Sequence, residues 1–150
     1  MDRKLSVLVV DDEIAILTIS RHFLEHRGFA VTTVDSGDEA LTALAAARYD
    51  LLICDKNMPG LHGLQVLVLA RQLQPHMATM LMTGSPEIVT FDGLQLDGYL
   101  EKPWHTAERL ANAALAAIEH RARVLGGAAP DADGGERSSR PDDQTQRTRS

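Results

Sequence analysis

The stretch LLICDKNMPG, residues 51–60, runs four apolar residues into an aspartate and then meets a proline-glycine stop. A short continuous apolar run is typical of a strand that is buried on both faces of a parallel sheet. A carboxylate at the end of such a strand is costly unless it lies at an edge of the fold, with partners or a chemical task. Asp55 is therefore the first candidate functional residue, and the rest of the chain decides what surrounds it.

Short apolar runs recur along the chain and predict five strands. They are expected at residues 5–10, 30–34, 51–54, 78–82 and 98–101. Helical periodicity predicts helices between and after them, at residues 13–27, 36–47, 64–73 and 106–125. Strands that alternate with helices indicate an α/β fold, in which a doubly wound parallel sheet carries helices on both faces.

Two of these helices carry local signals of their own. Ser36 followed three residues later by Glu39 is a capping box, which predicts the start of the second helix. The spacing of the third helix predicts that Leu64, Leu67 and Val68 face inward.

Composition divides the chain near its carboxyl terminus. The 150 residues are enough for one domain with a substantial core. Residues 126–150 contain no Ile, Leu, Val, Phe, Tyr or Trp, so they cannot bury enough surface to offset the entropy lost on ordering. We therefore expect one folded domain, residues 1–125, followed by a disordered tail, residues 126–150.

Charge and cysteine content narrow the classes of partner. The net charge of −6 argues against direct nucleic-acid binding, which requires clustered Lys and Arg. No apolar run approaches the roughly 18 residues of a membrane span. Cys54 is the only cysteine, so no internal disulfide is expected, and the thiol is read as a small buried hydrophobe. Together these features predict a cytoplasmic protein that does not contact membranes.

Polar residues follow four of the predicted strands at the point where each strand ends. Asp11 and Asp12 follow the first, Asp55 the third, Thr83 the fourth and Lys102 the fifth. In doubly wound sheets the ligand site lies at the carboxyl ends of the strands, so these side chains are expected to converge on one rim.

The predicted rim combines acidic groups with a cation and a hydroxyl. Clustered carboxylates repel one another unless a cation joins them, and a hard ion such as Mg²⁺ suits oxygen donors with open positions. A lysine and a threonine hydroxyl are suited to phosphoryl oxygens, and an aspartate can act as the nucleophile that forms an acyl phosphate. The sequence therefore predicts a Mg²⁺-dependent phosphoryl-acceptor site.

Single residues of this set also have simpler interpretations. Asp11 and Asp12 could merely cap the first helix, and Asp55 could introduce the turn that follows it. Thr83 alone is an ordinary turn hydroxyl. The six histidines show no spacing typical of metal ligands with cysteine or with one another. It is the expected convergence of distant residues that favours a functional site.

Four segments resemble the signatures of response-regulator receiver domains of bacterial two-component signalling. They are VLVVDDE, LLICDKNMPGLHG, LMTG and YLEKPW, and the similarity covers about residues 4–125 in order. Each motif alone is weak, but the ordered set is specific. The resemblance implies the flavodoxin-like receiver fold, a five-stranded parallel sheet with strand order 2-1-3-4-5.

The resemblance also implies roles for the acidic residues and for Asn57. Asp55 would be the phosphorylated aspartate. Asp12 and Asp55 would bind Mg²⁺ together with the main-chain carbonyl of Asn57, and Asp11 would act mainly through ordered water.

On the other side of the phosphoryl group, Thr83 and Lys102 would hold its oxygens. Tyr99 would be the aromatic switch that turns inward once Thr83 moves. The phosphoryl group would come from the phosphohistidine of a sensor histidine kinase or a phosphotransfer protein. The phosphorylated form would then change its binding to a downstream protein target.

The chain departs from the family between Thr83 and Lys102, which are closer in sequence than receivers usually have them. The segment PEIVTFDGLQLDG, residues 86–98, has a weak helical pattern interrupted by Asp92-Gly93. We expect a shortened or irregular fourth helix here, and we expect this region to be where phosphorylation is read.

Two alternative functions remain open at this point, and Asn57 argues against a third. The chain could be a phosphate shuttle in a phosphorelay, or a receiver-like interaction module that is never phosphorylated. A hydrolytic phosphatase of the haloacid-dehalogenase type would need a second aspartate at Asn57, and asparagine cannot supply its acid and base role. We therefore expect a signalling receiver and not an enzyme. The only reactions that we expect it to catalyse are its own phosphorylation and dephosphorylation.

Overall fold

The computed structural model describes residues 3–61, 63–84, 96–102, 104 and 106–126. The expected tail falls almost wholly outside these residues, because only Gly126 is described. Most of the expected fourth-helix segment, residues 86–95, also lies outside them.

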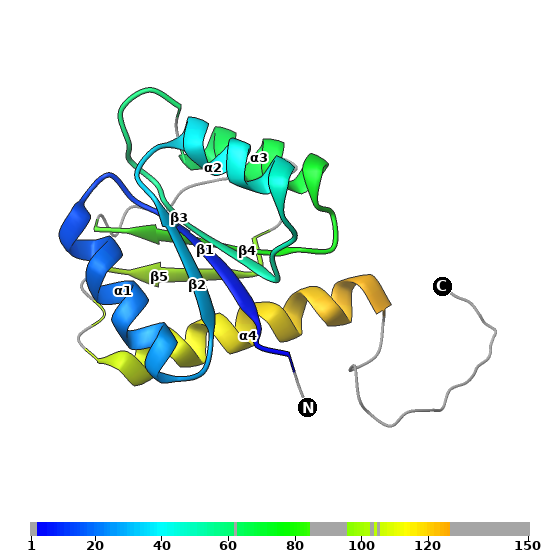
Figure 1. Ribbon diagram of the computed structural model, residues 1–150. Coiled ribbons are helices and arrows are strands. Elements are labelled where there is room, and N and C mark those ends of the chain that lie inside the picture. Colours follow the sequence, from blue (N-terminus) through cyan, green and yellow to red (C-terminus); the bar gives the residue numbers. More distant parts are fainter. Residues whose placement is uncertain (1–2, 62, 85–95, 103, 105, 127–150) are drawn as a thin grey trace.

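Five strands form one parallel sheet in the order β2-β1-β3-β4-β5 (Figure 1). Their bounds are β1 Ser6–Val10, β2 Ala30–Val34, β3 Leu51–Asp55, β4 Ala78–Thr83 and β5 Gly98–Glu101. Each strand lies within one residue of its predicted bounds at either end. The predicted α/β fold and the strand order 2-1-3-4-5 are confirmed.

Four helices lie on the two faces of this sheet within the described part of the chain. They are α1 Ile14–His26, α2 Gly37–Ala46, α3 Gly63–Leu73 and α4 Ala107–Gly126. Helices α1 and α4 pack on one face, and α2 and α3 pack on the other (Figure 1). Among the described residues, no helix combines the length and the apolar character needed to span a bilayer.

The central strand β3 explains why the sheet needs helices on both faces. Leu51 and Ile53 belong to the core under α1 and α4, whereas Leu52 and Cys54 belong to the core under α2 and α3. All four side chains are fully buried. Burial raises the pKa of the Cys54 thiol far above its usual range, so the thiol remains protonated. The prediction that Cys54 is a buried hydrophobe is confirmed.

The predicted capping box begins α2 with one difference. The Ser36 hydroxyl accepts a hydrogen bond from the Glu39 N–H at 3.1 Å, as expected for the cap. The Glu39 carboxylate accepts from the N–H of Asp35 at 3.4 Å, one residue before the cap.

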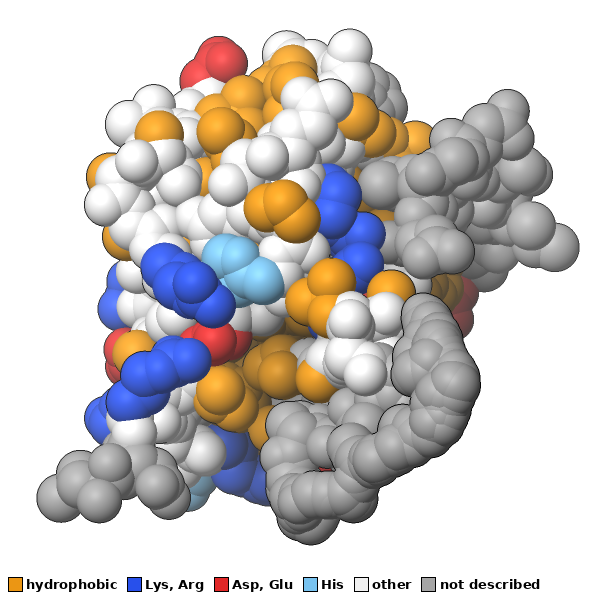
Figure 2. Space-filling view, turned by 90° about the vertical axis from the view of Figure 1, so that its right-hand side faces the viewer, with side chains coloured by type: hydrophobic (Ala, Val, Ile, Leu, Met, Phe, Trp, Pro, Cys, Tyr) orange, Lys and Arg blue, Asp and Glu red, His pale blue; other side chains and the backbone are white. Residues whose placement is uncertain are grey.

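Helix α3 faces inward through a different set of residues from the predicted one. Leu67 is fully buried and Leu64 is partly buried, but the side chain of Val68 is 43% exposed. Val66 and Ala70 are buried in its place, because i, i+3 and i+4 spacing from Gly63 sets the inward face. The prediction for Val68 is wrong. Hydrophobic atoms accordingly gather at the top of the surface in Figure 2, where α2 and α3 lie.

A buried carboxylate fixes the amino-terminal end of β5. The Asp97 side chain is fully buried and accepts hydrogen bonds from the Thr79 N–H at 2.9 Å and from Arg71 at 3.3 Å. An imidazole nitrogen of His120 lies 2.6 Å away, and Nε of Arg121 lies 3.9 Å away. Asp97 thus joins α3, β4 and α4 at the start of the strand that leads to Lys102.

Candidate functional site

The carboxyl ends of four strands lie along one rim of the sheet. Parallel pairing sets Val10 beside Cys54, Asp55 beside Met82, and Thr83 beside Glu101. The residues that follow these strands therefore meet, as the sequence predicted.

Three carboxylates converge at the centre of this rim. One oxygen each from Asp11, Asp12 and Asp55 can be chosen so that all lie within 4.8 Å of one another. Asp11 is fully buried and Asp55 is 5% exposed, whereas Asp12 is exposed. A group of two buried carboxylates and one exposed carboxylate is open to solvent on one side.

The Lys102 side chain reaches into this acidic group. Its Nζ lies 3.0 Å from Oδ2 of Asp11 and 3.3 Å from Oδ1 of Asp55. It also lies 3.3 Å from Oε1 of Glu13. The Lys102 side chain is only 11% exposed, so one largely buried ammonium group serves three carboxylates.

Glu13 is a site residue that the sequence analysis did not single out. It follows Asp11 and Asp12 directly, and this acidic run is the only signal that could have identified it. Its carboxylate is 64% exposed, so its pair with Lys102 is more strongly screened than the pairs with Asp11 and Asp55.

Asp11 is not the N-cap of α1, so the simpler interpretation of it as a helix cap is wrong. Its Oδ1 accepts a hydrogen bond from the N–H of Glu13 at 2.9 Å, and Glu13 is the N-cap of α1. The other oxygen of Asp11 pairs with Lys102. Asp11 therefore both orders the chain that enters α1 and holds the lysine at the rim.

Burial and mutual repulsion shift the protonation equilibria of this group. Burial and then the charge of Asp11 raise the pKa of Asp55 to about 6, although Lys102 acts in the opposite direction. Burial likewise raises the pKa of Asp11. Burial acts to lower the pKa of Lys102, but the neighbouring Asp11 and Asp55 carboxylates outweigh it and raise that pKa.

The donor set fits a hard divalent cation. It consists of carboxylate oxygens, it is exposed on the side of Asp12, and one lysine leaves part of its negative charge uncompensated. Mg²⁺ prefers oxygen ligands and retains several waters, so a few carboxylates at an open rim suit it. Asp11, Asp12 and Asp55 are the residues that could hold it.

Thr83 lies at the rim, whereas the role of Asn57 stays a prediction. Thr83 ends β4 and is 1% exposed, and its carbonyl accepts a hydrogen bond from the N–H of Lys102 at 2.7 Å. This bond places the backbone of Lys102 beside Thr83. Asn57 is exposed in the loop after β3. Tyr99 on β5 is 45% exposed, and its role as an aromatic switch stays a prediction.

A close approach between α3 and β3 supports the position of Asp55. Gly63 opens α3, and its N–H donates to the carbonyl of Lys56 at 3.3 Å. A Cβ atom at Gly63 would overlap the Asp55 carbonyl oxygen and would lie 2.9 Å from Cα of Lys56. Only glycine allows the helix to begin directly against the end of β3, which carries the candidate nucleophile.

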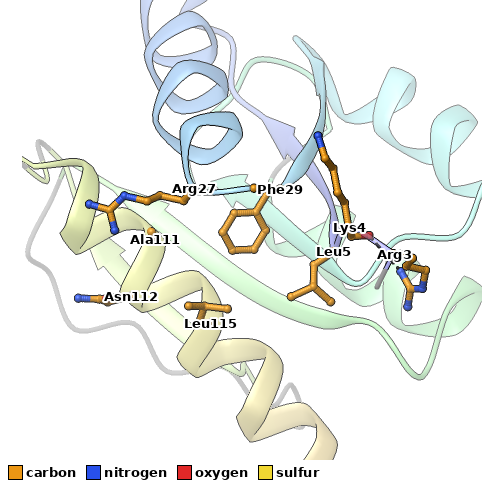
Figure 3. A pocket seen from close by; sticks show the side chains of 9 residues that line it. Arg3, Lys4, Leu5, Arg27, Phe29, Ala111, Asn112 and Leu115 are labelled. Carbon is orange, nitrogen blue, oxygen red and sulfur yellow. Dashed lines mark hydrogen bonds between the residues drawn. The ribbon is translucent and has the colours of Figure 1, made fainter. Parts of the chain in front are cut away.

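A separate cavity of ≈ 470 Å³ lies at the opposite end of the sheet (Figure 3). Phe29, Leu5 and Leu115 meet in its middle, between the start of β1 and α4. None of the predicted site residues lines this cavity. The chemistry at the rim therefore does not extend into it.

Comparison with known proteins identifies relatives over most of the described domain. A family model described as the response regulator receiver domain matches residues 7–114. The alkaline phosphatase synthesis transcriptional regulatory protein PhoP of Bacillus subtilis is 35% identical over 123 residues, which are 79% of this chain and 50% of that protein. The chain thus spans about half the length of this curated relative.

Solved structures agree with this match. A response regulator receiver domain protein from Clostridium thermocellum superposes with a TM-score of 0.67 at 32% identity, over 81% of this chain and 98% of that one. A response regulator from Burkholderia pseudomallei, solved with a phosphorylated aspartic acid, calcium ion and citrate, gives a TM-score of 0.67 at 28% identity. That match covers 83% of this chain and 72% of the other.

Proposed function

Because this chain belongs to the response regulator receiver domain family, we propose that it is a signalling switch phosphorylated on Asp55. One observation carries the proposal. The buried Asp55 carboxylate lies at the rim within reach of two further carboxylates and 3.3 Å from the ammonium group of Lys102. This arrangement combines a nucleophile, a cation-binding set and a fixed positive charge.

Phosphoryl transfer to Asp55 balances as a simple displacement. A carboxylate oxygen of Asp55 attacks the phosphorus of a phosphohistidine, the bond from phosphorus to the imidazole nitrogen breaks, and an acyl phosphate forms. The attacking group must be ionised, and a pKa of about 6 leaves Asp55 mostly ionised at neutral pH. A nucleophile of this pKa is more basic than an ordinary aspartate.

Lys102 has the main electrostatic role among the chain's own residues. Before transfer it pairs with Asp11 and Asp55, which holds the ammonium group at the rim. Once Asp55 carries the phosphoryl group as an acyl phosphate, its carboxylate charge is gone, and the same ammonium can pair with a phosphoryl oxygen. The Thr83 hydroxyl, at the end of the adjacent strand, is the proposed second donor to that group.

Asp11, Asp12 and Asp55, with the main-chain carbonyl of Asn57, would hold Mg²⁺. Bound Mg²⁺ would neutralise negative charge shared between these carboxylates and the phosphoryl oxygens. The phosphorylated aspartic acid and calcium ion in the Burkholderia relative support a phosphoryl site with a divalent cation in this family.

The proposed readout runs through Thr83 and Tyr99. Drawing the Thr83 side chain toward the phosphoryl group would free space that the half-exposed Tyr99 ring can enter. That movement would change the surface near β5 that a downstream protein binds. In this proposal the phosphoryl group comes from a sensor histidine kinase or from a phosphotransfer protein. The proposal also includes a cytoplasmic location.

Labelling with a small phosphodonor tests the function directly. The chain is incubated with acetyl phosphate and Mg²⁺, and the intact mass is measured. Wild type should gain one phosphoryl group, and Asp55→Asn should gain none while it remains folded. Glu119→Gln, which changes an exposed carboxylate on α4 away from the rim, is the control and should label normally. Labelling of Asp55→Asn at the wild-type level would refute the assignment.

The same material separates the alternative functions. A phosphatase would release inorganic phosphate over many turnovers from p-nitrophenyl phosphate, and we expect none. A shuttle would pass the phosphoryl group from Asp55 to an added histidine phosphotransfer domain. An interaction module that is never phosphorylated would show no labelling of the wild-type chain.

A further inference from the structure

Two histidines share the outer surface of α1. His22 and His26 are four residues apart, a helical spacing that the sequence analysis did not take as metal-binding, and their rings are nearly parallel with centroids 6.4 Å apart. Both side chains are exposed, whereas Leu17 and Leu24 of the same helix are buried. The pair therefore lies on the face of α1 that points away from the sheet, where the view in Figure 1 shows no other element over the helix.

Neither imidazole is committed to another part of the fold. Among the residues that the structure describes, His22 and His26 make no hydrogen bond or ion pair. Their rings contact each other, and the His22 ring also contacts Phe23. Their nitrogen lone pairs are thus available to a ligand from solvent.

The neighbouring cations on α1 are already paired. Arg21 binds Glu25 at 3.2 Å and also donates to the carbonyl of Val31 at 3.1 Å, which holds its guanidinium beside β2. Arg27 lies 3.6 Å from Glu108 of α4. Because both guanidinium groups face carboxylates, their repulsion of a further cation is reduced.

We propose that His22 and His26 together bind a divalent transition-metal ion such as Zn²⁺, Ni²⁺ or Cu²⁺, separate from the carboxylate rim. Imidazole nitrogen suits these ions, and i, i+4 residues lie on one face of a helix. Metal–nitrogen bonds of about 2.0–2.1 Å require the two nitrogens to approach to roughly 3 Å. Exposed side chains can reach that distance by rotating about χ1 and χ2, with no change in the backbone.

The donor chemistry distinguishes this site from the rim. Two imidazoles favour borderline ions, whereas the carboxylates of Asp11, Asp12 and Asp55 favour hard ions such as Mg²⁺. The remaining coordination positions at the histidine pair would be filled by water. The site does not depend on the proposed phosphorylation, so either proposal can fail without the other.

The test is calorimetric titration of Zn²⁺ into the untagged full chain, with excess Mg²⁺ present to occupy the rim. Wild type should bind one ion at this site. His22→Gln and His26→Gln should each weaken binding by about tenfold or more, since loss of even an outer-shell partner of a metal commonly costs 10- to 100-fold. The double variant should bind little worse than either single variant, because one imidazole alone does not chelate.

Two matched controls locate the site. His120→Gln removes a part-exposed helical histidine that lacks a histidine four residues away, and Asp12→Ala alters the rim. Both should bind Zn²⁺ like wild type. If His22→Gln and His26→Gln also bind like wild type, or if Asp12→Ala abolishes binding, the proposal is wrong. A circular-dichroism spectrum of each variant checks that α1 is still folded.

Discussion

The ammonium nitrogen of Lys102 lies 3.3 Å from Oδ1 of Asp55, and both side chains are close to nine-tenths buried or more. Lys102 is also 3.0 Å from Asp11, which is fully buried. One cation therefore faces two buried carboxylates, with Asp12 beside them. Burial and then the charge of Asp11 raise the pKa of Asp55, and the negative charge that Lys102 leaves uncompensated predicts a demand for a further cation.

The raised pKa of Asp55 predicts a specific pH dependence of stability without metal. The folded-state pKa of about 6 lies above the usual aspartate pKa of 3.8, so the folded state binds this proton more tightly than the unfolded state. The resulting stabilisation is fully present below pH 3.8 and is lost as pH rises through about 6. We expect Asp55→Asn to gain stability over wild type as pH rises from 4 to 7.

The measurement is urea denaturation of both proteins in chelator across that range. The difference between them isolates Asp55 from groups with the opposite behaviour, such as Asp50, whose pKa is lowered by Arg3 and Ser6 despite burial. A difference that stays constant with pH would contradict the prediction.

Mg²⁺ should stabilise the folded chain through Asp12. An ion that binds only the native state at about 100 times its dissociation constant adds about 2.7 kcal/mol to the free energy of unfolding. Asp12→Ala should remove most of this gain. Without metal, the same variant should be slightly more stable than wild type, because one repelling charge is gone. Thermal melts with and without Mg²⁺ measure both effects, and an unchanged Mg²⁺ response in Asp12→Ala would exclude the site.

Replacing Lys102 with glutamine should change stability and the Mg²⁺ response in the direction opposite to that of Asp12→Ala. Removing one partner of a buried ion pair costs on the order of 3 kcal/mol, because the remaining charges are left unpaired. Lys102→Gln should therefore destabilise the metal-free chain and enlarge its Mg²⁺-induced rise in Tm, while phosphoryl labelling falls. Glu13→Gln, which removes the exposed partner of the same lysine, should change stability much less. Equal effects of the two variants would contradict the burial argument.

Gly63→Ala should damage the site through backbone displacement. The added methyl group overlaps the Asp55 carbonyl oxygen, and overpacking of this kind costs about 1–3 kcal/mol. We expect lower stability and slower labelling by acetyl phosphate. Gly126→Ala is the control, because an added Cβ there meets nothing within 4 Å. The prediction fails if Gly63→Ala labels and unfolds like wild type.

Asp97→Asn should loosen the start of β5 without touching the rim. The substitution keeps the shape of the side chain but leaves Arg71 and Arg121 without the buried negative charge that they face. We expect a loss on the order of 3 kcal/mol in urea denaturation, whereas exposed Asp35→Asn should stay within about 0.5 kcal/mol of wild type. A loss no larger than that of Asp35→Asn would show that Asp97 is not the anchor of this strand.

The sequence alone determined the architecture and the convergence of Asp11, Asp55 and Lys102 on the rim, although it did not single out Glu13. LLIC at residues 51–54 predicted a strand buried on both faces, and alternation with helices predicted a parallel sheet. In a parallel sheet all carboxyl ends meet at one edge, so the positions of Asp11, Asp55 and Lys102 after their strands were enough to bring them together. These features follow from local periodicity and from the order of strands and helices, and both can be read from the sequence.

Only the tertiary structure decided how the charges are shared. That Lys102 serves Asp11, Asp55 and also Glu13 depends on side-chain reach across the rim, which no spacing in the sequence specifies. The same holds for the complete burial of Asp97 and for the outward position of Val68. Burial and pKa are set by contacts between segments far apart in the chain, because desolvation and Coulomb interactions depend on three-dimensional distance and not on sequence order.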